Sequence, residues 1–304
     1  MKLSVLSMMV LLVGIPGVGR TQDLETTYQS LKDAEAKGDA VAVKKLAAET
    51  SALARKAAAE AAPQDADEKD AWTKRVEYAK DVDLQAEYAL VDLAVRSQPA
   101  TTVDLLAALE ALNPKSKYLD DAYANYLYAL NQAGYSAKIP AIAEKALANF
   151  PENPDLLYFL AEHARSLNQS DRAQGYANRL VAALGKRPKP EGMSEADWEK
   201  RKSLQIGSGY WISGVVAGEK NQYAAADKNL RAALPYVKGN DVRTAAALFY
   251  LGTANYNLGK MTMSKAKVLE GAKFSDQCAA ISGPYAEQAY KNALIMKSEA
   301  GRMR

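Results

Sequence analysis

Apolar and polar residues follow one another along this chain with the spacing of helices. Tyr28, Leu31 and Ala34 recur at intervals of three residues, and this spacing places them on one face of an amphipathic helix. The same pattern, interrupted by Gly, Pro and Asn, predicts about thirteen helices and no strands. Outside two helix pairs in residues 120–185, the predicted helices span residues 23–37, 39–61, 65–97, 101–112, 194–218, 223–234, 242–258, 263–274 and 285–300.

The two helix pairs within residues 120–185 are copies of each other at an interval of 34 residues. Tyr123 aligns with Leu157, and Gly134 aligns with Asn168. Further copies run through residues 210–234 and 248–272. A period of this length is typical of helix-pair solenoids, whose units bury their apolar faces against neighbours and present a concave binding surface. The sequence therefore predicts an all-α fold, a right-handed superhelical solenoid of antiparallel helix pairs.

The predicted domain organisation has four parts. A signal peptide over residues 1–22 is followed by a helical-repeat segment over residues 23–184. Residues 185–193 form a linker, in which Pro188 and Pro190 exclude helix. A second helical-repeat segment, residues 194–304, opens with Ser194 capping the amide of Asp197 and ends in a capping helix.

The first residues have the three parts of a secretory signal peptide. Lys2 gives a charged start, residues 3–13 are almost entirely apolar, and residues 14–19 contain small residues. Cleavage is expected after Gly19, or alternatively near Gln22. We therefore expect a bacterial periplasmic or secreted protein whose mature chain has no stable membrane span. The alternative is a membrane anchor made by an uncleaved N-terminal segment.

Charge and reactive residues argue against several functions. The net charge of +3 falls to +1 without Lys2 and Arg20, which is too balanced to predict a nucleic-acid partner. His163 is the only histidine and Cys278 the only cysteine, and we expect both to be packing residues. Gly207-Ser208-Gly209 lacks the Gly-x-Ser-x-Gly pattern of a hydrolase elbow. The sequence predicts no catalytic residue, no metal site and no cofactor, and therefore no enzyme.

Two segments resemble tetratricopeptide repeats. Residues 251–260, Leu-Gly-Thr-Ala-Asn-Tyr-Asn-Leu-Gly-Lys, resemble the first helix of such a repeat, and residues 221–235 resemble the second. The resemblance covers residues 120–272 well and residues 23–113 loosely. The chain departs from the pattern at Leu127, where the repeat has a small residue, and at the linker. The resemblance implies a scaffold that binds a peptide or helix of another protein in a concave groove.

The candidate groove residues are aromatic, amide and charged side chains of the predicted first helices. The chain has 17 Tyr and only 4 Phe, and tyrosine suits interfaces because it combines a large ring with a polar group. The alternative is that most of these rings pack between helices. We predict an exported, non-catalytic scaffold for an envelope protein; the alternatives are an accessory domain that binds a ligand or cell-wall polymer, or a self-associating structural subunit. The candidates are Asp121, Tyr128, Asn131, Gln132, Tyr158, Glu162, Arg165, Trp211, Phe249, Tyr256 and Asn257.

Overall fold

The computed structural model describes residues 18–190 and 192–303, with side chains from Asp23 onward. Within them it contains thirteen α-helices, one short 3-10 helix and no strand, so the all-α prediction is confirmed. The predicted cleavage positions Gly19 and Gln22 fall inside the first helix, and the rest of the predicted signal peptide lies outside the described residues.

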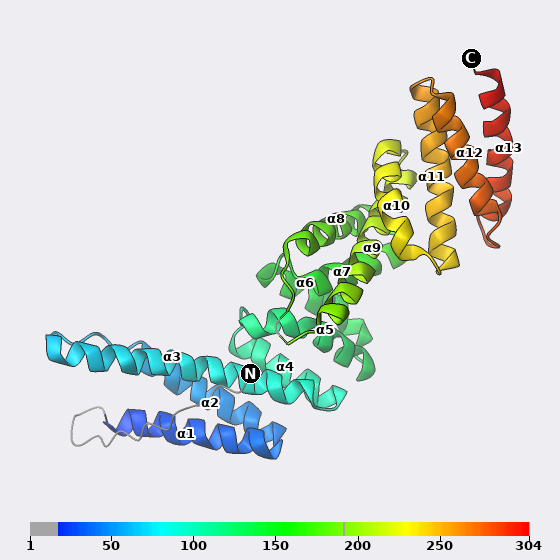
Figure 1. Ribbon diagram of the computed structural model, residues 1–304. Helices are drawn as coiled ribbons and strands as arrows, with labels where there is room; N and C mark the ends of the chain where they lie inside the picture. Colours follow the sequence, from blue (N-terminus) through cyan, green and yellow to red (C-terminus); the bar gives the residue numbers. More distant parts are fainter. Residues whose placement is uncertain (1–17, 191, 304) are drawn as a thin grey trace. The chain divides into compact units, whose positions relative to one another are not determined.

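The helices form two compact units (Figure 1). Unit 1 ends at Ser136 and unit 2 begins at Ala137. Unit 1 contains five α-helices: α1 Val18–Lys37, α2 Ala40–Ala58, α3 Ala66–Val95, α4 Pro99–Leu112 and α5 Lys117–Gln132. The short 3-10 helix η1, Ser136–Lys138, spans the boundary. Unit 2 contains α6 Ile139–Asn149, α7 Pro154–Ser166, α8 Ser170–Lys186, α9 Glu195–Glu219, α10 Tyr223–Val237, α11 Asp241–Met261, α12 Lys265–Ala279 and α13 Ala286–Arg302.

Within each unit, consecutive helices pack together, and alternate helices also touch. In unit 1, α3 contacts both α1 and α5; in unit 2, α9 contacts both α7 and α11. Each unit therefore has one side built from its odd-numbered helices. This arrangement decides which side chains can meet across helices.

A left-handed residue ends the first helix of several pairs. Gly134 has φ 81° and Asn168 has φ 54°, so the 34-residue alignment of these positions is confirmed by the backbone. Asn221 and Met263 have the same conformation, at φ 57° and φ 52°. Gly and Asn tolerate this region, whereas Met is strained there. In each case the next residue's N–H bonds back across the turn, as when Gln169 donates to the carbonyl of Ala164.

Side-chain caps start many of the helices. The Ser194 hydroxyl accepts a hydrogen bond from the Asp197 amide at 3.1 Å, as predicted. Helix α4 begins two residues before its predicted start at residue 101. Its first residue is Pro99, whose missing N–H and fixed φ suit a first turn, and the Thr102 hydroxyl donates to the carbonyl of Ala94.

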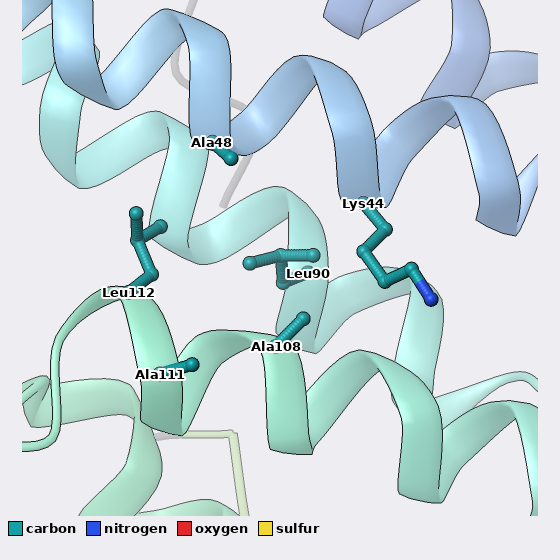
Figure 2. Close-up of a pocket in the computed structure, with 6 residues that line it drawn as sticks. All are labelled: Lys44, Ala48, Leu90, Ala108, Ala111 and Leu112. Carbon is teal, nitrogen blue, oxygen red and sulfur yellow. The ribbon is translucent and has the colours of Figure 1, made fainter.

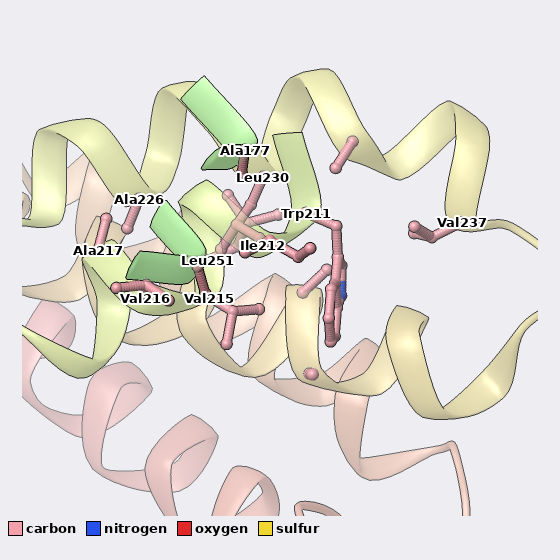
Figure 3. Close-up of a cluster of buried hydrophobic side chains, with 14 of the residues drawn as sticks. Ala177, Trp211, Ile212, Val215, Val216, Ala217, Ala226, Leu230, Val237 and Leu251 are labelled. Carbon is pink, nitrogen blue, oxygen red and sulfur yellow. The ribbon is translucent and has the colours of Figure 1, made fainter. Parts of the chain in front are cut away.

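The core of unit 2 depends on small residues that let helices approach closely. Figure 3 shows Ile212 and Val215 of α9 among the buried side chains of this core. A Cβ on Gly214 would lie 2.5 Å from Leu230, and one on Gly252 would lie 2.4 Å from the Ser275 hydroxyl. Ala226 is completely buried. From the small size of their side chains, the sequence predicts that Gly252 and Ala226 lie where helices pack closely; the short Cβ distance at Gly252 confirms this for α11 and α12.

Candidate functional site

The most regular surface feature of unit 1 is a stripe of polar and aromatic residues on α3. Tyr78, Asp81, Gln85 and Tyr88 follow one another at intervals of three or four residues, and all four are exposed. Residues at these spacings share one side of a helix. The stripe extends over about 15 Å, because each residue advances a helix by about 1.5 Å.

The same stripe recurs on α5, 40 residues later in the sequence. Tyr118, Asp121, Asn125 and Tyr128 repeat the order aromatic, acid, amide, aromatic at the same intervals. The Tyr128 side chain is 62% exposed. We call the residues of the two stripes the tyrosine face; they are Tyr78, Asp81, Gln85, Tyr88, Tyr118, Asp121, Asn125 and Tyr128.

Contacts between neighbouring helices join the two stripes into one surface. The rings of Tyr88 and Tyr118 have centroids 5.6 Å apart, with their planes inclined by 60°. The hydroxyl of Tyr78 donates a hydrogen bond to the carboxylate of Glu25 on α1. Helices α1, α3 and α5 therefore present a continuous side of unit 1, and Figure 1 locates these helices.

Two carboxyl groups meet at the margin of the tyrosine face. Glu35 of α1 and Asp92 of α3 share a hydrogen bond, and burial together with Asp92 raises the pKa of Glu35. Arg96 bonds Asp92 at 2.5 Å and offsets part of this rise. Burial first, then Asp92 and Glu35, raise the pKa of Tyr88. A hydrogen bond between two carboxyl groups requires a proton on one of them, and the raised pKa of Glu35 favours that proton, while Arg96 pairs with Asp92.

The corresponding side of unit 2 is organised around Arg243, a residue that the sequence did not single out. Its guanidinium donates to Glu162 at 2.8 Å and to the Ser208 hydroxyl at 2.6 Å. The guanidinium also lies 5.0 Å from the centre of the Trp211 ring, and the Trp211 indole N–H donates to the Arg243 carbonyl at 2.9 Å. Tyr158 hydrogen-bonds Ser208, and burial raises its pKa. The structure thus brings Tyr158, Glu162 and Trp211 together.

These contacts change how Trp211 is interpreted. The side chain is only 9% exposed and belongs to the core of unit 2, as Figure 3 shows. The sequence made Trp211 a candidate groove residue, with packing between helices as the alternative. In the structure, the Arg243 guanidinium and neighbouring helices cover the ring, so Trp211 offers little surface to a partner.

The remaining unit 2 candidates also make contacts within the unit. Arg165 pairs with Glu219 of α9 at 2.8 Å. Phe249 stacks near Tyr285, with ring centroids 4.9 Å apart. The Tyr256 hydroxyl donates to Glu299 of α13 at 2.9 Å, and the Asn257 amide donates to a carbonyl of its own helix. Arg165 thus links α7 to α9, and Tyr256 links α11 to α13.

The candidates of unit 1 are more exposed. Tyr128, Asn131 and Gln132 all lie on the exposed part of α5. The Asn131 side chain accepts a hydrogen bond from Ser136 at 2.7 Å. Gln132 continues the α5 stripe by one more turn, at the position that Asp92 occupies on α3. The sequence-based candidates thus include Asp121 and Tyr128 of the α5 stripe, but not Tyr118 or Asn125, and they include no residue of the α3 stripe.

A separate apolar pocket lies among α2, α3 and α4 of unit 1. It has a volume of about 340 Å³ and is lined by Lys44, Ala48, Leu90, Ala108, Ala111 and Leu112. Figure 2 shows Lys44 at one end of the apolar lining. The Lys44 ammonium pairs with Asp104 at 2.6 Å. The pocket therefore offers apolar contact beside a cation that already has a counter-ion.

The single cysteine and the single histidine both pack against neighbouring groups. Cys278 is buried and donates to the carbonyl of Ala245, and burial raises its thiol pKa to about 11. A thiol with this pKa is a weak nucleophile at neutral pH. His163 is half-buried, with its ring stacked on Phe159 at 5.8 Å. In residues 18–190 and 192–303, no group of three His, Cys, Asp or Glu side chains is placed to hold a metal ion.

Comparison with known proteins adds no assignment. No family model, no curated protein and no solved structure matches this chain. Among the helices that the structure describes, none combines the length and apolar character needed to cross a membrane. Function must therefore be inferred from the α1–α3–α5 side of unit 1 and the α7–α9–α11 side of unit 2. Of these two sides, the tyrosine face is the one that presents large aromatic side chains to solvent at regular intervals.

Proposed function

We propose that this chain is an exported, non-catalytic scaffold that binds a peptide or helix of another envelope protein through its first-helix faces. The proposal includes the tetratricopeptide-like solenoid that the sequence resembles, and a periplasmic or secreted location. The observation that carries it is the repetition of one set of side chains on α3 and α5. Tyr78, Tyr88 and Tyr128 are 42%, 43% and 62% exposed.

Physical reasons favour a protein partner for such a surface. Tyrosine provides a large ring, a hydroxyl and few rotatable bonds, so it contributes contact area at a small entropy cost. The acid and amide between each tyrosine pair can bond main-chain N–H and carbonyl groups of a bound segment. An adjacent helix with the same set extends the surface along a chain-like ligand.

Site-specific crosslinking in the source cell tests this proposal. A photoreactive residue at Tyr88 or Tyr128 should form an adduct with one discrete protein of the envelope. The matched control is Val41 on α2, which is 76% exposed but lies off the tyrosine face. An adduct at twice the chain's own mass would indicate self-association instead. Equal labelling at all three positions, or no protein adduct at any of them, would contradict the proposal.

Export requires its own measurement. N-terminal sequencing of the protein from the source cell should give a chain that starts near Arg20 or Asp23. Recovery of chains that begin at Met1 in the soluble cytoplasmic fraction would contradict export. Recovery of intact chains in the membrane fraction would favour the uncleaved anchor.

A further inference from the structure

Charge is distributed unevenly between the two units. Residues 1–136 contain 15 Lys and Arg against 20 Asp and Glu, a net charge of −5. Residues 137–304 contain 24 Lys and Arg against 16 Asp and Glu, a net charge of +8. The balanced total of +3 conceals this difference. An acidic unit attracts cationic partners and raises their rate of encounter.

The tyrosine face concentrates this negative charge beside exposed rings. Asp81 lies between the two tyrosines of the α3 stripe, and Asp121 lies between those of the α5 stripe. Glu35 and Asp92 add carboxyl groups at the margin, where they contact each other. An aromatic ring attracts a cation over its face, and a neighbouring carboxylate strengthens the attraction.

The chain's own lysines show that these rings accept ammonium groups. The Lys32 ammonium lies 4.5 Å from the centre of the Tyr28 ring on α1. The Lys117 ammonium lies 4.9 Å from the centre of the Tyr118 ring on α5. Both rings belong to the α1–α3–α5 side of unit 1. Among the described residues, no Lys or Arg lies over the rings of Tyr78, Tyr88 or Tyr128, and these residues are 42%, 43% and 62% exposed.

We infer that the tyrosine face binds a lysine- or arginine-rich segment of the partner polypeptide. The inference rests on the proposed function and names the chemistry of the partner. The cations of the segment lie over the rings of Tyr78, Tyr88 and Tyr128, and the exposed carboxylate of Asp81 lies between the first two rings along α3.

The geometry also predicts the spacing of the cations. Packed helices have axes about 8–10 Å apart, and a polyproline II segment advances about 3.1 Å per residue and returns to the same side at every third residue. A segment that crosses from α3 to α5 therefore reaches the next stripe after about three residues. The preferred ligand carries Lys or Arg at every third position.

Titration of labelled peptides into the full-length protein tests this inference. The probe is a fluorescent peptide of Lys-Ser-Gly triplets, and its matched control has Glu in place of each Lys. A third peptide has the same composition with its lysines clustered at one end. The spaced lysine peptide should bind most tightly, and its affinity should fall as salt concentration rises. Equal affinity for the lysine and glutamate peptides would overturn the inference, and equal affinity for the spaced and clustered lysine peptides would overturn the predicted spacing.

Substitutions on and off the tyrosine face test where the lysine peptide binds. Tyr88→Ala and Tyr128→Ala should each weaken binding of the lysine peptide about two- to five-fold, the range expected for loss of one exposed cation–ring contact. The matched control is Tyr290→Ala on α13, which removes a tyrosine that is 58% exposed in the basic unit. Asp81→Asn should weaken binding, whereas Glu49→Gln on α2 should not. Far-UV circular dichroism and a thermal unfolding curve show whether each variant is folded.

Four outcomes contradict the inference in distinguishable ways. If all three tyrosine variants bind the peptide equally, the tyrosine face is not the site. If wild-type protein sediments with purified cell-wall polymer, does not bind the lysine peptide, and loses sedimentation on Tyr88→Ala, the occupant is the polymer. If the protein dimerises at low salt and Tyr128→Ala abolishes the dimer, the occupant is a second copy. A single crosslinked envelope protein without a basic segment would leave the proposed function standing and overturn this inference alone.

Discussion

The two units have similar helical architecture, but they use their polar and aromatic side chains differently. On the α1–α3–α5 side of unit 1, the rings of Tyr88 and Tyr128 face solvent. On the α7–α9–α11 side of unit 2, Arg243 bonds Glu162 and Ser208 and covers Trp211. A polar group that is paired within the protein stabilises the packing of helices, whereas an exposed ring is available to a partner. The comparison separates residues that hold the fold together from residues that can bind.

The largest expected effect is on the stability of unit 2, where Trp211 is covered by other side chains. Trp211→Ala should destabilise unit 2 by about 3–5 kcal/mol, because it removes a core ring and leaves a cavity. Chemical denaturation followed by circular dichroism would measure the loss. The buried Cys278 thiol gives a second readout, since it should react with a thiol reagent faster in the variant. A loss below about 1 kcal/mol would mean that the ring is not part of the core.

A somewhat smaller effect is expected where α11 and α12 pack closely. Gly252→Leu should cost about 1–3 kcal/mol, because any side chain there meets the Ser275 hydroxyl at 2.4 Å and the Gly271 carbonyl at 3.2 Å. Gly175 is the matched control, since a Cβ on this helical residue meets nothing within 4 Å. Gly175→Ala should stabilise the protein by about 0.4–1 kcal/mol. Equal destabilisation by both changes would contradict the close approach of α11 and α12.

The turn after α11 offers a small gain in stability. Met263 has φ 52° and its side chain is 87% exposed, so it is strained without compensating burial. Met263→Asn should stabilise the protein by about 0.5 kcal/mol, because Asn tolerates this conformation and already occupies it at positions 168 and 221. Met261→Asn is the control, since Met261 is also exposed but its φ is not positive. A shift of the thermal midpoint that is the same in both variants would contradict the explanation.

The smallest effect on stability is expected at the tyrosine face. Tyr88→Ala and Tyr128→Ala should each change the free energy of unfolding by less than about 0.5 kcal/mol, as is usual for exposed residues. The same variants should weaken binding of the lysine peptide. If either variant destabilised unit 1 as strongly as Trp211→Ala destabilises unit 2, the contrast between an open and a closed side would be wrong.

The sequence by itself determined the local structure. The helical periodicity predicted the helices, Ser194 predicted a cap, and the alignment of Gly134 with Asn168 identified a shared turn. It also predicted that Cys278 is buried and that Gly252 and Ala226 lie at close contacts. These features depend on residues near one another in the chain, or on the small size of a side chain at an apolar position. Local sequence therefore carries enough information to specify them.

Only the tertiary structure decided which side chains are covered. Trp211 and Tyr128 are both aromatic residues at predicted first-helix positions, but one is 9% exposed and the other 62%. The difference depends on Arg243, which comes 32 residues after Trp211 and folds back over its ring. The pairing of the α3 and α5 stripes likewise required the contact of Tyr88 with Tyr118, because a period of 34 residues does not align repeats that are 40 residues apart. Helical periodicity fixes the direction of a side chain relative to its own helix, and the packing of other helices then determines whether it meets protein or water.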